Sequence, residues 1–168
     1  IIMKFKFFNA LAVTFLASTS AFALDAKFAD KSWDGVTVPT GQQCQKFGGI
    51  NPATPKLIVS EIPAESNALV LEYSDRNYEV MDNGGHGIMK FMIDPQKSQV
   101  EVPSVLGHTF DIPKEFTLIE AHRSPSWDKA GAYMPPCSGG KNNEYYVTIK
   151  AVKDDKVTAS TVLEMGKY

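Results

Sequence analysis

The chain has 168 residues, 43% of them hydrophobic and 21% charged, with a formal net charge of −2 at pH 7. This length is enough for one domain with a substantial core. The slightly acidic balance, without a basic patch interleaved with aromatic residues, argues against nucleic acid or anionic lipid as a partner. An anionic ligand would therefore have to be bound locally, by a few directed donors.

The first 23 residues have the layout of a cleavable secretory signal. After Met3, two lysines precede an apolar run over 7–17, and small residues end at Ala23. The run is shorter than the roughly 20 residues of a membrane-spanning helix, so we expect export to the periplasm or the medium rather than anchoring. Cleavage would leave a single domain over 24–168, with 15 basic residues against 19 acidic ones and a net charge of about −4.

Alternating apolar and polar residues predict strands in the remaining chain, with almost no helical periodicity. The expected strands are 57–62, 68–73, 88–93, 99–102, 116–121, 145–152 and 157–165. Residues 24–32 are expected to form a loose arm or an edge strand. The segment 68–71 is apolar on both faces, which is typical of a central strand covered on two sides. Residues 154–156 are expected to form a short hairpin connection.

Two cysteines, Cys44 and Cys137, follow the signal segment. In an oxidising compartment such a pair is more often bridged than free, and closing a loop of roughly 90 residues stabilises by about 4 to 5 kcal/mol in the chain-entropy model. Two buried thiols are the alternative. A metal site is not expected, because neither cysteine belongs to a Cys-x-x-Cys pair and the three histidines are scattered.

The segment 131–144 combines two prolines and three glycines directly before an expected strand. Prolines fix φ and glycines allow positive φ, so this segment is expected to be a tight, shaped loop. Its backbone N–H groups, the hydroxyl of Ser138 and the ammonium of Lys141 could hold a small anion. A long surface hairpin is the alternative interpretation.

Several features occur in a particular order along residues 33–168. Prolines and glycines follow Trp33, Asp75 ends the apolar strand, His86 opens the next strand, and a Pro-Pro loop leads to a strand beginning at Tyr145. This order resembles the phosphatidylethanolamine-binding protein (PEBP) family, in particular its bacterial branch of Raf-kinase-inhibitor-like proteins. The resemblance implies a mostly β fold, an antiparallel β-sandwich with few or no long helices. The fold would be trimmed near the C-terminus, where family members carry a helix-containing segment before the last strand.

The resemblance also implies a small pocket for an anion or a phosphorylated head group, without a cofactor. Carried onto this chain, the ligand-binding residues are Asp75, His86, Tyr133, Pro136, Ser138, Gly139, Asn143 and Glu144. We expect His86 to donate to a bound oxygen while Asp75 holds its other nitrogen or a neighbouring amide, with Tyr133 as wall and hydroxyl. The alternative for His86 is a strand-end histidine satisfied by Asp82 or by backbone. Purely structural roles are expected for His108 and His122.

The chain departs from the family pattern at two places. Tyr73-Ser74-Asp75 stands where the family has Asp-Pro-Asp, and Asn143-Glu144 stands where it has His-Arg or His-His. A carboxylate in place of a cation removes attraction for a phosphate and adds repulsion. No Gly-x-Ser-x-Gly segment is present, so catalysis is not expected. The sequence favours an exported, non-enzymatic binding protein, and the alternative is a protein-interaction or inhibitor module with a vestigial pocket.

Overall fold

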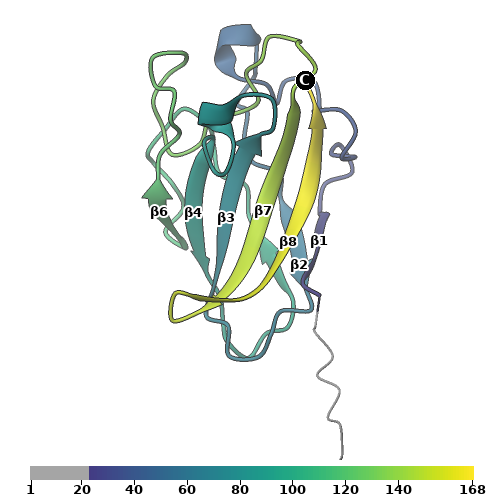
Figure 1. Cartoon of the computed structure of the whole chain (residues 1–168), viewed down its shortest axis with the longest axis vertical. Coiled ribbons are helices and arrows are strands. Elements are labelled where there is room, and N and C mark those ends of the chain that lie inside the picture. The colour runs from purple at the N-terminus through teal and green to yellow at the C-terminus, as the bar shows by residue number, and fades with distance from the viewer. Residues whose placement is uncertain (1–22) are drawn as a thin grey trace, which may run out of the picture.

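The structure is a computed structural model that describes residues 23–168. The expected signal peptide therefore lies, up to residue 22, outside the described residues. The described chain forms two antiparallel sheets, with strand orders β1-β2-β5 and β6-β4-β3-β7-β8 (Figure 1). The strands are β1 Asp25–Phe28, β2 Leu57–Ser60, β3 Ala68–Asp75, β4 Gly87–Met92, β5 Val100–Val102, β6 Phe116–Glu120, β7 Glu144–Lys153 and β8 Lys156–Lys167. Two short 3-10 helices, η1 Gln45–Phe47 and η2 Glu79–Met81, lie between them in the sequence. The expected mostly β, antiparallel architecture is confirmed.

Strand β3 lies at the centre of the larger sheet, between β4 and β7. Its register pairs Asp75 with Tyr145 of β7 and Tyr73 with Gly87 of β4. The predicted central position of this strand is confirmed, but the expected cover on both faces is wrong: Val70 and Glu72, on its outer face, are only half-buried. Because antiparallel neighbours run in opposite directions, the end of β3 lies beside the beginnings of β4 and β7. One end of the sheet therefore collects side chains from three strands.

Strands β7 and β8 form the expected hairpin, at the end of the sheet opposite the C-terminus (Figure 1). The two turn residues, Asp154 and Asp155, have φ values of 48° and 65°. Positive φ at both central positions matches the right-handed twist of the flanking strands, and aspartate tolerates this conformation better than most residues. No helix separates the last two strands, which confirms the trimmed C-terminal region.

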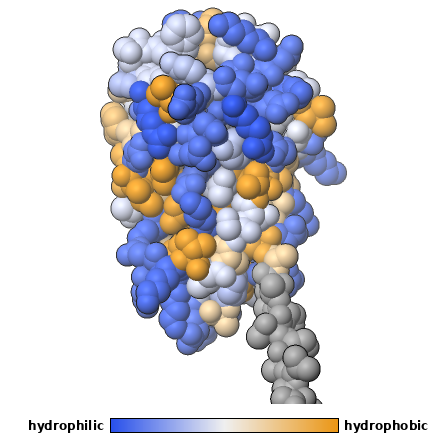
Figure 2. All heavy atoms as spheres, viewed as in Figure 1, coloured by the Kyte–Doolittle hydropathy of each residue, from blue (hydrophilic) through white to orange (hydrophobic). Residues whose placement is uncertain are grey.

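The core lies between the two sheets. Alternate residues of β2 and β3, including Leu57, Val59, Leu69 and Leu71, are fully buried. The outer face of the larger sheet mixes apolar and polar side chains, whereas the end near the C-terminus is mostly hydrophilic (Figure 2).

Strand β1 pairs only with β2 and is the edge strand expected over 24–32. Within residues 23–168, no helix is long and apolar enough to cross a membrane.

A disulfide joins Cys44 and Cys137, whose Cα atoms lie 5.2 Å apart. The pairing is therefore as expected, and the alternative of two free thiols is wrong. The bond ties the segment before η1 to the Pro-Pro loop. In the described part of the chain, one group of side chains has the spacing of a metal site: the two cysteines and Asp128, whose carboxylate lies within 4.8 Å of both sulfur atoms. Sulfur atoms joined in a disulfide are not thiolate ligands, so the oxidised protein offers no thiolate metal site here.

Candidate functional site

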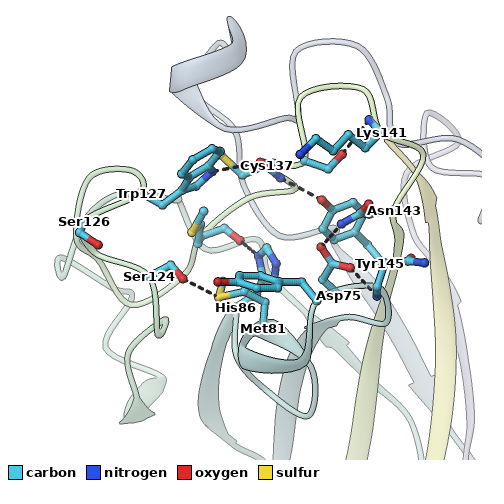
Figure 3. A pocket seen from close by; sticks show the side chains of 14 residues that line it. Asp75, Met81, His86, Ser124, Ser126, Trp127, Cys137, Lys141, Asn143 and Tyr145 are labelled. Atoms are coloured by element: carbon cyan, nitrogen blue, oxygen red, sulfur yellow. Dashed lines mark hydrogen bonds between the residues drawn. The ribbon is translucent and has the colours of Figure 1, made fainter.

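A cavity of about 450 Å³ opens at the end of the sheet where β3 ends and β7 begins (Figure 3). Four of the residues expected to bind a ligand line it: Asp75, His86, Ser138 and Asn143. The other lining residues are Asn77, Tyr78, Met81, Ser124, Ser126, Trp127, Met134, Cys137, Lys141 and Tyr145. The register of β3, β4 and β7 thus brings together side chains that are up to 70 positions apart in the sequence.

His86 lies in the wall of this cavity and is 3% exposed. Its Nδ1 lies 2.6 Å from the carbonyl oxygen of Met134. A carbonyl can only accept, so Nδ1 carries the proton and Nε2 presents a lone pair. Within residues 23–168, Nε2 has no hydrogen-bond partner. The ring is thus held as in the alternative stated for His86, by backbone, and not by Asp75, which instead accepts from the neighbouring backbone amide of Asn77.

The His86 ring is neutral near pH 7. Burial lowers its pKa to about 4, since desolvation penalises the charged imidazolium. The Met134 carbonyl and the Asp75 carboxylate act in the opposite direction but do not offset the burial. His86 therefore faces the cavity as a hydrogen-bond acceptor.

Asp75, at the end of β3, is 4% exposed. Its Oδ1 accepts from the backbone N–H of Asn77 at 2.8 Å, and its Oδ2 accepts from Nδ2 of Asn143 at 2.7 Å. No cationic side chain of the described residues forms an ion pair with it. This buried carboxylate is therefore balanced by neutral donors alone. Asn143, at the position where the family has a cationic residue, serves to hold it.

Two potential donors remain at the other side of the cavity. The Tyr145 hydroxyl accepts from the Cys137 N–H at 3.2 Å, and its ring meets His86 edge-on at 5.4 Å. Lys141 is exposed, and its ammonium forms no ion pair with any carboxylate of residues 23–168. Figure 3 shows it on the loop above Asn143 and Tyr145. The Ser138 hydroxyl is not free, because it donates to the carbonyl of Tyr168.

Tyr133 does not line the cavity, although it was expected to supply a wall and a hydroxyl. It is 1% exposed, its ring packs 5.0 Å from that of Tyr73, and its hydroxyl has no partner among the described residues. The neighbouring Met134 faces the cavity instead. This segment packs against the start of β4, where a Cβ on Gly87 would lie 2.2 Å from the Ala132 carbonyl oxygen. Only glycine permits that approach, at its φ of 126°.

Glu144 also lies outside the cavity. Its carboxylate pairs with Lys167 at 2.9 Å in a second hollow, of about 390 Å³, that Arg76 and Glu164 share. The nearby Lys167 ammonium lowers the pKa of Glu144, so the side chain is ionised and paired. The repulsion of anions expected from Glu144 is therefore directed away from the cavity.

Pro136 and Gly139 shape the loop without lining the cavity. The Pro136 carbonyl accepts from the Cys44 N–H at 2.9 Å. Gly139 is exposed at a φ of 70°, and a Cβ there would contact the Phe47 ring at 2.9 Å. Both residues therefore support the loop that carries Ser138 and Lys141.

The other two histidines have structural partners. His108 accepts from the Gln45 N–H at 3.1 Å through Nε2, and His122 donates from Nε2 to the Lys129 carbonyl at 3.1 Å. Burial lowers the pKa of His122 as it does for His86. Neither ring lines the cavity, in keeping with their expected structural roles.

Three apolar lining residues, Met81, Trp127 and Met134, had no signal as site residues in the sequence. Met81 belongs to the short η2 helix, and Trp127 lies in a Ser-Pro-Ser-Trp loop without strand periodicity. The indole Nε1 of Trp127 donates to the Cys137 carbonyl at 3.1 Å, which fixes the ring beside the disulfide. Tertiary packing, and not a local sequence pattern, brings these three side chains to the cavity.

No protein-family model matches this sequence, and no curated protein sequence matches it either. Among solved structures, the chain is similar to a crystal structure from Chlamydia trachomatis D/UW-3/CX that is described as a PEBP homologue. The two chains are 21% identical and superpose with a TM-score of 0.52, over 88% of this chain and 97% of the other. At 21% sequence identity, this similarity shows the fold alone. The chain therefore has a PEBP-like fold, as its sequence predicted.

Proposed function

We propose that the protein is an exported, non-enzymatic binding protein whose cavity takes a small ligand with an anionic or phosphorylated group. The PEBP-like fold suggests a binding protein. A volume of about 450 Å³ is in the range of small-molecule sites. The observation that carries the proposal is the pair of groups at one cavity that can donate to an anion, the Lys141 ammonium and the Tyr145 hydroxyl.

Binding accounts for this geometry better than catalysis does. A nucleophile needs a base within hydrogen-bond reach, and no serine hydroxyl of the described residues hydrogen-bonds to His86. The hydroxyl of Ser124, which also lines the cavity, donates to the Met81 sulfur at 3.1 Å. The His86 ring is held by a carbonyl rather than by a carboxylate that would stabilise an imidazolium.

Export is supported by two features. The first 23 residues have the layout of a secretory signal, and the disulfide is typical of proteins that fold in an oxidising compartment. We therefore place the ligand in the periplasm or the medium. A small phosphorylated compound could reach the cavity there without crossing a further membrane.

Calorimetric titration with phosphoethanolamine, inorganic phosphate and acetate tests this function. We expect phosphoethanolamine to bind and Lys141→Gln to weaken it about two- to fivefold, the effect of one exposed charge. The matched control is Lys156→Gln, an exposed lysine at the hairpin end of the sheet, which should leave the affinity unchanged. Equal effects of the two variants, or no binding of any compound, would contradict the proposal.

A second candidate is an interaction or inhibitor module that binds a protein partner. The exposed apolar side chains of Tyr78 and Trp127, which line the cavity, and of Val80, which precedes the lining residue Met81 in η2, favour it. This candidate predicts that replacing Val80 by serine weakens a protein complex and leaves small-ligand binding unchanged. A response to phosphoethanolamine that depends on Lys141 would instead support the small-ligand function.

A further inference from the structure

Four side chains that carry metal-binding atoms meet at the disulfide. The carboxylate Oδ2 of Asp128 lies 3.9 Å from the Sγ of Cys137 and 3.6 Å from the Nε2 of His108. The Sγ of Cys44 lies within 4.8 Å of the same carboxylate. The group is enclosed, since both cysteines are buried and the side chains of His108 and Asp128 are 1% and 11% exposed. Sulfur, imidazole nitrogen and carboxylate oxygen are the atoms to which zinc binds in proteins.

The spacing of these atoms is close to that of a tetrahedral zinc site. Zinc bonds of about 2.3 Å to sulfur and about 2.0 to 2.2 Å to nitrogen and oxygen place the ligand atoms of a tetrahedron roughly 3.3 to 3.8 Å apart. The distances from Asp128 to His108 and to Cys137 lie in or next to this range. The two sulfur atoms, now bonded to each other, would have to separate. Their Cα atoms are 5.2 Å apart, so side-chain rotation brings both sulfurs to one ion without a shift of the backbone.

Backbone N–H groups orient the two ligands that are not cysteines. The Oδ1 of Asp128 accepts from the Lys129 N–H at 2.7 Å, and its Oδ2 accepts from the Lys46 N–H at 3.4 Å. The Nε2 of His108 accepts from the Gln45 N–H at 3.1 Å. The ring proton is therefore on Nδ1, and the lone pair of Nε2 is available to a metal. Hydrogen bonds to the ligands of a metal commonly fix their orientation in this way.

We propose that reduction of the disulfide creates a zinc site with four ligands: Cys44, Cys137, Asp128 and His108. A dithiol supplies two electrons and two protons, the S–S bond opens to two thiols, and the dithiol becomes a disulfide. Zinc then binds the two thiolates, and their protons pass to the solvent. Two thiolates and a carboxylate carry three negative charges, which a divalent cation largely neutralises in a buried place.

The disulfide and the zinc ion exclude each other, because both use the same two sulfur atoms. The site therefore exists before the bond has formed and whenever a dithiol reopens it. Zinc that binds only the reduced protein stabilises that form by mass action. At a zinc concentration about 100 times the dissociation constant, the thiol–disulfide equilibrium should shift about 100-fold toward the thiols. This inference is independent of the ligand proposed for the cavity.

Zinc titration of the reduced and the oxidised protein tests the site without a variant. A phosphine is the reductant, because a thiol would compete for the metal. We expect the reduced protein to bind one zinc ion about 100-fold or more tightly than the oxidised protein. Cobalt(II) in place of zinc should give the charge-transfer absorption of thiolate ligands and the intense visible bands of a tetrahedral ion. Equal zinc affinities of the two forms, or a cobalt spectrum without thiolate absorption, would overturn the proposal.

Asp128→Asn distinguishes a built site from two loose thiols. We expect the zinc affinity of the reduced protein to fall about tenfold or more. Asp111→Asn, at an exposed carboxylate outside the group, is the matched control and should leave the affinity unchanged. An unchanged thermal midpoint of the oxidised Asp128→Asn protein shows that the variant is folded. Equally tight zinc binding in that folded variant would mean that the thiols alone hold the metal, against the proposal.

Nuclear magnetic resonance of the unaltered, reduced protein tests the fourth ligand and does not depend on any variant. Zinc should shift the Nε2 resonance of His108 much further than those of His86 and His122, whose ring nitrogens lie outside the group. A His108 resonance that stays in place while one zinc ion binds would refute the site with these four ligands.

Discussion

Replacing Cys44 and Cys137 together by alanine is expected to lower the free energy of unfolding by about 4 to 5 kcal/mol, the largest effect of any change considered. The bond joins residues 93 positions apart, and closing so long a loop removes much conformational entropy from the unfolded chain. Both cysteines are buried, and the bond anchors the loop that carries Ser138 and Lys141. The loss should therefore weaken ligand binding as well as stability.

Urea unfolding of the two proteins measures this effect. The control is a reductant, which should shift the unfolding midpoint of the unaltered protein toward that of the double variant and leave the variant where it is. A difference below about 1 kcal/mol would contradict the account, because it would mean that the crosslink constrains little of the unfolded chain.

Acidification from pH 7 to pH 4 is expected to destabilise the protein by up to about 3 kcal/mol through His86 alone. In the unfolded chain this histidine takes up a proton near pH 6.5, whereas the folded protein resists protonation until about pH 4. The contribution of His86 is therefore complete above pH 6.5 and is lost as the pH falls from 6.5 toward 4. The neutral ring is favoured in the fold because it is buried against the Met134 carbonyl.

The measurement compares unfolding free energies of the unaltered protein and His86→Gln across this pH range. Glutamine can still donate to the Met134 carbonyl but does not titrate. His122 and the carboxylates are common to both proteins, so the difference between the two curves isolates His86. Two parallel curves would show that the imidazole is already solvated in the folded protein.

Local patterns were sufficient to predict the strands. The alternation over 145–152, the doubly apolar run 68–71 and the two aspartates of the hairpin each specify structure within a few residues. The bridge between the two cysteines was expected from the layout of the first 23 residues, because exported proteins commonly pair their cysteines. The strands and the hairpin are thus encoded by residues close together in the sequence, and the disulfide was expected from the presence of two cysteines after a signal-like segment.

The site was predicted in part, at strand ends and in the Pro-Pro loop. The resemblance to the PEBP family indicated Asp75 and His86, and the loop indicated Ser138. Tyr145 lies on the cavity side, so alternation along the strand implies that Glu144 faces away. The segment around Tyr133 has no such period, so the sequence did not show which of Tyr133 and Met134 faces the ligand. Met81 and Trp127 reach the cavity through tertiary packing alone.

The chemistry of His86 depended on a contact that is 48 residues distant in sequence. The Met134 carbonyl fixes which ring nitrogen carries the proton and so converts an expected donor into an acceptor. No property of the residues next to His86 indicates this. The polarity of the cavity therefore became evident only from its three-dimensional structure.

Nuclear magnetic resonance of the His86 ring nitrogens measures directly whether this ring is neutral and faces the cavity with the lone pair of Nε2. At pH 7 we expect a neutral ring with the proton on Nδ1, and an Nε2 resonance that shifts on titration with phosphoethanolamine while those of His108 and His122 stay in place. A ring protonated on Nε2, or an Nε2 resonance that does not move when phosphoethanolamine is bound, would contradict the account.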